Sequence, residues 1–175
     1  FYSRWSKYLS SHQLPGESVD TAKDLTARHR ILVLDHCTPT PNQDAGSVQL
    51  YNFCLLLRDM NFQVTFIPED NFLYMPDYTT GLQRTGIEVL YAPFTTCVRD
   101  HLLEYGARYD VVSVYRPVVF EKYIGDIQEL ARNAKIIYHT VDLHFLRMRR
   151  EAELLGDNEI MNAAEEMREK ELKAL

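Results

Sequence analysis

Apolar runs alternate with helix-like segments along most of the chain. Runs that predict strands buried on both faces occur at residues 30–35, 62–68, 87–93, 109–117 and 135–141. A helix-like segment separates each run from the next, and this alternation is typical of right-handed crossovers between parallel strands. The pattern therefore predicts an α/β fold with a Rossmann-like, doubly wound parallel sheet.

The segments between the runs predict helices. Residues 47–61 are dense in apolar side chains and indicate a largely buried helix, and residues 96–106 predict another. Gly86 is the expected end of a short helix in the segment 78–86. The following helix shows a clear apolar face on the sheet, because apolar side chains recur three or four residues apart at Phe120, Ile124, Ile127 and Ala131.

The two ends of the chain do not follow this alternation. Residues 1–29 predict a helical N-terminal extension, broken at Leu14-Pro15-Gly16. Residues 30–175 predict a single domain. Its last part, after residue 149, is polar, acidic and rich in helix formers, so we expect the domain to end in a long acidic helix.

Composition limits the class of protein. A chain of 175 residues with 46% hydrophobic and 25% charged residues has the size and balance of one folded domain. No run approaches the roughly 18 apolar residues that a transmembrane helix needs. The net charge of −6 argues against nucleic acid as a partner, because a phosphate-binding surface is normally basic.

The cysteines and the N-terminal residues predict the compartment. Cys37, Cys54 and Cys97 have no CxxC spacing and leave one thiol unpaired in any pairing, so we expect reduced thiols. The N-terminal stretch FYSRWSKYLSSHQLPGE lacks the apolar region of a secretory signal. These features predict a cytoplasmic protein without a transmembrane segment, and they leave peripheral membrane association and homo-oligomers open.

A long polar loop, DHCTPTPNQDAGS, follows the first predicted strand. In open α/β sheets ligands bind outside the carboxyl ends of the strands, where this loop begins. Gly46 permits close backbone approach, and the amides of Gly46, Ser47 and Val48 would open a helix N-terminus that favours anions. In the alternative interpretation, Asp44 and Ser47 only cap that helix. The dinucleotide and P-loop glycine patterns are both absent.

A second polar group, YHTVDLHFLR, follows the fifth predicted strand and is expected at the same sheet edge. His139 and His144 would point to opposite faces of an extended chain, which disfavours a metal site. We expect one of these histidines to hydrogen-bond a ligand while Asp142 orients it. Alternatively, these residues cap the next helix and pair with the arginines between Arg147 and Arg150.

Arg116 is expected at the carboxyl end of the fourth strand, directly before Pro117. A guanidinium group at this edge could hold an anion through two parallel hydrogen bonds. A surface salt bridge is the alternative interpretation.

Several of these stretches together resemble the N-terminal domain of GT-B glycosyltransferases, especially family 4-like enzymes of bacterial surface-polysaccharide assembly. The resemblance covers about residues 30–155, and its most specific parts are DHCTPTPNQDAGS and VDLHFLR. It implies an acceptor-side domain that works with a second, donor-binding domain, which we expect to be missing from this piece. The implied co-substrates are a nucleotide-sugar donor and a sugar or glycan acceptor, with no cofactor and no metal.

The resemblance also assigns roles to single residues. Gly46 with Ser47 matches the glycine region of the first loop, which approaches the transferring sugar or the donor phosphate. His139 resembles the histidine near the reacting sugar. A His-Asp pair is frequent in the family at this place, whereas this chain has Val141-Asp142, so the choice between His139 and His144 stays open.

Two other classes compete with a transferase domain. A receiver-like signalling domain shares the alternating α/β order, but ILVLDH and IIYHTV lack the acidic pair and the late lysine that a receiver needs. A non-catalytic interaction module would instead use the acidic C-terminal helix to bind a partner or to dimerise.

Overall fold

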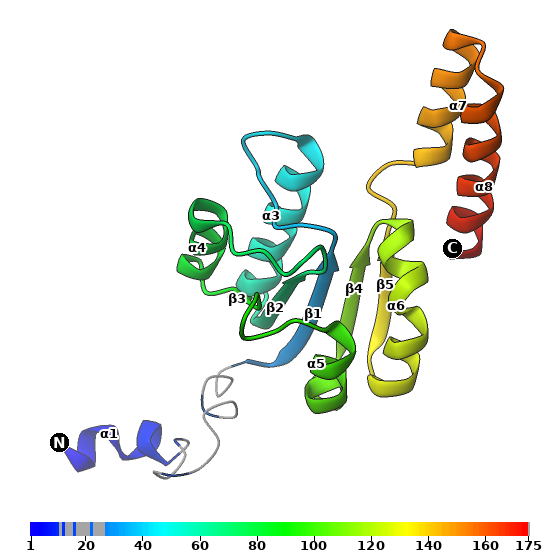
Figure 1. Ribbon diagram of the computed structural model, residues 1–175. Helices are drawn as coiled ribbons and strands as arrows, with labels where there is room; N and C mark the ends of the chain where they lie inside the picture. The colour runs from blue at the N-terminus through cyan, green and yellow to red at the C-terminus, as the bar shows by residue number, and fades with distance from the viewer. Residues whose placement is uncertain (11, 13–15, 17–21, 23–26, 175) are drawn as a thin grey trace.

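The computed structural model describes residues 1–10, 12, 16, 22 and 27–174. It confirms a five-stranded, all-parallel sheet with helices on its faces, and the strand order is β3-β2-β1-β4-β5 (Figure 1). This arrangement is that of a Rossmann-like, doubly wound fold. The strands are β1 (His29–Asp35), β2 (Phe62–Pro68), β3 (Glu88–Val89), β4 (Val111–Tyr115) and β5 (Lys135–His139).

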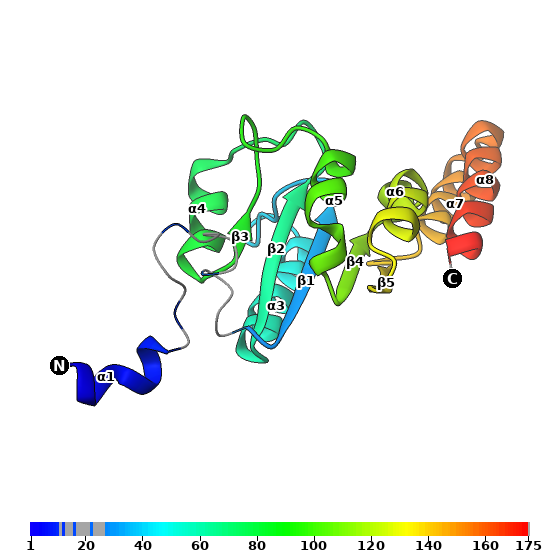
Figure 2. The same cartoon turned by 90° about the horizontal axis from the view of Figure 1, so that it is seen from below.

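Helices cover the sheet in two layers. The crossover helices are α3 (Ala45–Asp59), α4 (Pro76–Arg84), α5 (Val98–Tyr105) and α6 (Pro117–Leu130). Helices α3 and α4 cover one face of the sheet, and α5 and α6 cover the other (Figure 2). Alternate residues of β1 face the two layers: Ile31 and Val33 pack with α3 and α4, while Leu32 and Leu34 pack with α5 and α6. Both layers are needed because the central strands are buried on both faces.

Two predictions about this core need correction. The buried face of α6 is formed by Val119, Tyr123 and Ile127, with Ala131 just after the helix, so the predicted Phe120 and Ile124 lie beside it. Phe120 is partly buried and packs at the border of this core, where its ring lies 4.8 Å from that of Tyr138. Strand β3 is also much shorter than predicted, because the chain turns at Tyr91, whose carbonyl accepts from the amides of Phe94 and Thr95.

The C-terminal segment is a pair of helices and not the single long helix that was predicted. These helices are α7 (His144–Leu155) and α8 (Asn158–Ala174), which pack side by side (Figure 1). The chain reverses at Gly156, whose left-handed φ of 66° ends α7 in the way that glycine favours. Asp157 then accepts from the amides of Glu159 and Ile160 at the start of α8.

The N-terminal extension contains helix α1 (Tyr2–Leu9), which has no buried residue and lies away from the sheet in both views (Figures 1 and 2). The sheet begins at His29, one position inside the predicted extension, because His29 pairs with Phe62 of β2. Leu14 and Pro15 of the predicted helix break lie outside the described residues.

Candidate functional site

The strand order reverses direction between β1 and β4. The chain builds β2 and β3 on one side of β1 and then crosses to β4 and β5 on the other side. At such a switch point the loops after the two central strands diverge and leave a crevice at the carboxyl ends. The predicted site residues lie in or directly beside the loops that leave β1, β4 and β5 at this edge.

An ion pair lies directly at the switch point. The Nε of Arg116, which follows β4, donates to Oδ1 of Asp35 at the end of β1 over 2.7 Å. Asp35 is 4% exposed and also accepts from the amide of His36. Burial raises the pKa of Asp35 above its usual value, and the hydrogen bond from Arg116 opposes that rise.

The guanidinium of Arg116 is only partly used by this pair. Its side chain is 33% exposed, and in the part of the chain that the structure describes its two terminal amino groups have no partner. The surface salt bridge of the alternative interpretation does not describe it, because Asp35 is buried. Anchored through Nε, the planar group retains donors that suit an anion. Arg116 itself has a φ of 71°, an uncommon value for a residue with a side chain.

Gly46 lies where two of the site loops touch. A Cβ at this position would come within 3.2 Å of both Asp44 Oδ1 and Val141 Cγ1. Val141 follows β5, so the loops after β1 and β5 do open at the same edge, as the sequence predicted. Gly46 does not have a left-handed φ. Close approach is therefore the reason that the position has no side chain.

Asp44 and Ser47 form a helix cap. Asp44 precedes α3 and accepts from both the amide and the hydroxyl of Ser47, over 2.8 and 2.6 Å. These hydrogen bonds lower the pKa of Asp44. The amide of Val48 donates to the carbonyl of Asp44, so of the three amides proposed to bind an anion only that of Gly46 has no acceptor among the described residues. The capping interpretation therefore describes the geometry of Asp44 and Ser47.

His139 ends β5 with its ring packed on the α3 side of the sheet. The ring stacks on Tyr115 with centroids 4.4 Å apart and meets the edge of Phe53 at 4.8 Å. Burial lowers the pKa of His139, which favours the neutral ring. Its Nε2 is buried and has no partner among the described residues.

His144 is turned away from this group. Its amide and Nδ1 both lie within 3.0 Å of Oε1 of Glu171 on α8, and its Nε2 lies 3.3 Å from Asp142. Asp142 also pairs with Arg147 over 3.4 Å. The structure thus brings Gly46, Arg116 and His139 to one edge, while His144 and Asp142 hold the start of α7.

Two buried hydroxyl groups near the switch point were missed by the sequence analysis. Thr38 in the first loop and Tyr115 at the end of β4 are 2% and 1% exposed, and their hydroxyls have no partner among the described residues. Unpaired buried polar atoms are uncommon and call for a ligand, water or a stored strain. Nothing in a local pattern marks them, because Tyr115 reads as an ordinary strand residue.

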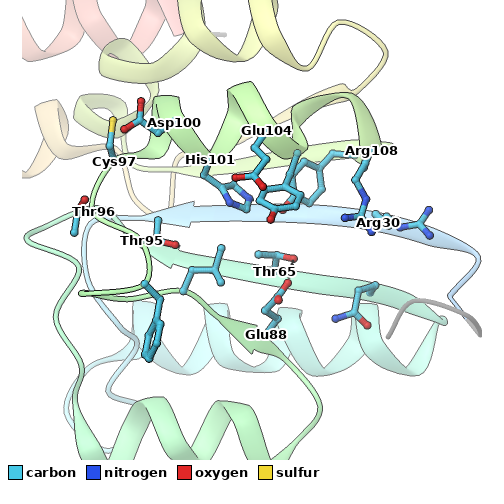
Figure 3. A pocket seen from close by; sticks show the side chains of 15 residues that line it. Arg30, Thr65, Glu88, Thr95, Thr96, Cys97, Asp100, His101, Glu104 and Arg108 are labelled. Atoms are coloured by element: carbon cyan, nitrogen blue, oxygen red, sulfur yellow. Dashed lines mark hydrogen bonds between the residues drawn. The ribbon is translucent and has the colours of Figure 1, made fainter. Parts of the chain in front are cut away.

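A separate hollow of 420 Å³ lies on the opposite face of the sheet, between the strands and α5 with the short 3₁₀ turn η1 (Gly106–Arg108) (Figure 3). Thr65 and Glu88 form part of its floor and are joined by a 2.9 Å hydrogen bond. His101 and Glu104 face them from α5. None of the predicted site residues lines this hollow.

Among the described residues, no group of three His, Cys, Asp or Glu side chains is placed to hold a metal ion. In the same part of the chain no helix is long and apolar enough to cross a membrane. Cys37, Cys54 and Cys97 are all free thiols. Comparisons of the chain with known protein families, curated proteins and solved structures found no match.

Proposed function

We propose that this chain is the acceptor-side domain of a glycosyltransferase. The enzyme would transfer a sugar from a nucleotide-sugar donor to an acceptor hydroxyl in polysaccharide or glycoconjugate synthesis. The observation that carries the proposal is Arg116, which is anchored at the switch point by the buried Asp35 and whose two terminal amino groups have no partner among the described residues. A fixed guanidinium at a ligand-binding edge suits the diphosphate of such a donor.

In this proposal the acceptor oxygen attacks the anomeric carbon of the donor sugar, the bond to the diphosphate breaks, and the proton of the acceptor hydroxyl passes to the leaving diphosphate. The leaving diphosphate gains charge, which Arg116 and the amide of Gly46 stabilise from this domain. The neutral ring of His139 stacks on Tyr115 beside this edge, and its buried Nε2 has no partner among the described residues. A second domain of the enzyme supplies most of the donor site, in keeping with the resemblance of DHCTPTPNQDAGS and VDLHFLR.

Arg116→Lys and Gly46→Val in the enzyme with both domains test the proposal. Arg116→Lys keeps the charge but loses the planar fork, so turnover should fall at least tenfold. Gly46→Val adds a branched side chain whose Cβ would lie 3.2 Å from Cγ1 of Val141. This variant should abolish transfer while the domain still folds. Arg132→Lys is the control, because the side chain of Arg132 donates to a backbone carbonyl at the far end of α6. Normal turnover by folded Arg116→Lys and Gly46→Val enzymes would refute the proposed site.

Calorimetry with the isolated chain gives an independent test. Because the proposal places most donor contacts in the second domain, nucleotide-sugars should bind this chain weakly or not at all. Tight binding would show that the chain is not half of such an enzyme.

A second candidate function is the binding of another protein chain through α7. Leucines at 143, 146, 154 and 155 line a groove on this helix, and Leu154 and Leu155 are 86% and 67% exposed. Exposed apolar patches of this kind often mark interfaces. Sedimentation of the wild type and of Leu154→Glu checks this: a dimer that the variant abolishes would favour the interaction module.

A further inference from the structure

Three aromatic rings form a row on the two loops that follow β2 and β3. Tyr74 and Tyr91 have centroids 4.8 Å apart, and Tyr91 meets Phe94 at 5.7 Å in an edge-on arrangement. The row ends at the surface, since Tyr74 is 40% and Phe94 79% exposed. Tyr91 packs against the core, but neither the core nor the switch-point site accounts for the exposed rings of Tyr74 and Phe94.

The backbone holds the row in a defined shape. Asn71 and Phe72 both have left-handed φ values, 52° and 53°, which turn Phe72 into the core and leave Tyr74 outside. The amide of Ala92 donates to the carbonyl of Phe72 over 2.9 Å and so joins the two loops. Such conformations cost about 1–3 kcal/mol each and persist only where the surroundings enforce them. The rings therefore sit on a preorganised support.

The row is continuous with the switch-point edge. Tyr74 hydrogen-bonds Thr80 on α4, and the hydroxyl of Tyr78 on the same helix joins Asn42 and Gln43 of the first loop over 2.8 and 3.0 Å. In the strand order, β3 and β4 are separated by three neighbour spacings. At about 4.8 Å per spacing this is about 14 Å along the edge.

We propose that Tyr74, Tyr91 and Phe94 form a stacking subsite for a neutral oligosaccharide. A pyranose presents C–H groups on its faces and hydroxyls on its rim, and the electron-rich face of an aromatic ring attracts those C–H groups. The surrounding hydroxyl and amide groups, on Thr80, Tyr78, Asn42 and Gln43, are suited to the rim. This inference rests on the proposed function and gives its acceptor a distal contact, while the reacting end lies at the switch point.

The local charge argues for a neutral sugar and against an anionic membrane or nucleotide. Of the four carboxylates in residues 69–97, which carry the whole row, Glu69 is buried and paired with Lys122, and Glu88 is hydrogen-bonded to Thr65. The exposed charges of this segment are those of Asp70, Asp77 and Arg84. Acidic membrane lipids attract clusters of basic residues, and this segment, with one arginine, has no such cluster. The exposed phenyl ring of Phe94 also borders the polar hollow between the sheet and α5, which leaves space beside it for a bulky ligand.

The test is saturation-transfer NMR on the 175-residue chain with a panel of neutral di- to hexasaccharides of α- and β-linked hexose and N-acetylhexosamine. At least one oligosaccharide should bind, with affinity that rises with length, and Phe94→Ala should weaken it about tenfold. The matched control is Leu103→Ala on α5, because Leu103 is 61% exposed and lies outside the row. Unchanged melting temperatures confirm that both variants fold.

Three results would overturn the inference: no saccharide binds, Phe94→Ala binds as tightly as wild type, or the rings partition into phosphatidylcholine or phosphatidylglycerol vesicles in place of sugar. The two proposals fail separately. If the sugar binds at the rings but the two-domain protein transfers nothing, the glycosyltransferase proposal fails and the subsite stands. If transfer occurs and Phe94→Ala leaves the acceptor KM unchanged, the subsite fails and the transferase stands.

Discussion

The contact at Gly46 yields a sharp prediction, because the chain offers a matched glycine elsewhere. Gly46 lies in the first turn of α3, and Gly125 lies within α6. Neither has a left-handed φ, so alanine suits the backbone at both positions. A Cβ at Gly125 would meet nothing within 4 Å, whereas a Cβ at Gly46 would meet Asp44 and Val141 at 3.2 Å.

The two substitutions should therefore change stability in different directions. Alanine in place of glycine in a helix interior stabilises by about 0.8–1.0 kcal/mol, and Gly125→Ala should show most of this gain. Gly46→Ala gains less, since it lies near the helix end, and overpacking costs about 1–3 kcal/mol. The net result for Gly46→Ala is a loss of up to about 2 kcal/mol. Asp44 does not move away easily from the added Cβ, because its carboxylate is hydrogen-bonded to the amide and hydroxyl of Ser47.

Urea unfolding followed by circular dichroism measures both variants, and thermal unfolding supports it. For a chain of this size 1 kcal/mol corresponds to about 2–4 °C, so the two melting temperatures should lie several degrees apart. If Gly46→Ala stabilises the chain as much as Gly125→Ala, the loops after β1 and β5 do not meet closely. The proposed site would then lose the contact that assembles it.

Other predictions concern the pH dependence and the buried charges. Because burial lowers the pKa of His139, the folded chain takes up a proton less readily than the unfolded chain. The free energy of unfolding should therefore fall as the pH drops below about 6.5. In urea titrations at several pH values, His139→Phe should show a smaller fall than the wild type. An unchanged slope would mean that the ring is open to solvent. The carboxylate of Glu171 is buried and accepts a hydrogen bond from the amide of His144 at the start of α7. Glu171→Ala should therefore lower the free energy of unfolding by about 1–3 kcal/mol, and Glu171→Gln should lower it less. Equal losses for the two variants in urea unfolding would contradict a cap by the carboxylate. Arg116→Gln should lower the free energy of unfolding by about 2 kcal/mol or more, because it leaves the buried Asp35 without its partner. Adding Asp35→Asn to this variant should recover part of that loss. Additive losses in the double-mutant cycle would show that the two residues are not coupled.

Local patterns along the chain carried most of the architecture. Continuous apolar runs are the signature of strands buried on both faces, and the positions of all five strands in the parallel sheet followed from them. The start of α3 was also readable, because Asp44 and Ser47 are only three positions apart and their capping interaction is local. Such features need no knowledge of distant parts of the chain.

Interactions between distant segments had to come from the tertiary structure. Arg116 could be placed at a strand end, but its partner Asp35 lies 81 positions away, and only the strand order puts β1 beside β4. The sequence did not distinguish His144 from His139. In the structure α8 packs against α7 and places Glu171 within hydrogen-bond distance of His144. Helical periodicity likewise predicted that α6 has an apolar face, but it did not predict which apolar residues of α6 are fully buried. Phe120 contacts Tyr138, and this contact depends on the position of α6 on the sheet.

The row of aromatic rings shows the same division. Tyr74 and Tyr91 are ordinary residues of two loops in the sequence, and no local pattern pairs them. Their contact exists because β2 and β3 are neighbours in the sheet and the loop after β2 reverses at Asn71 and Phe72. The sequence by itself determined which segments are buried and whether they form helices or strands. The reason is that apolar composition and the spacing of apolar residues along a segment indicate both properties. Which surface groups meet was decided by the chain crossovers, since these bring together residues that are far apart along the chain.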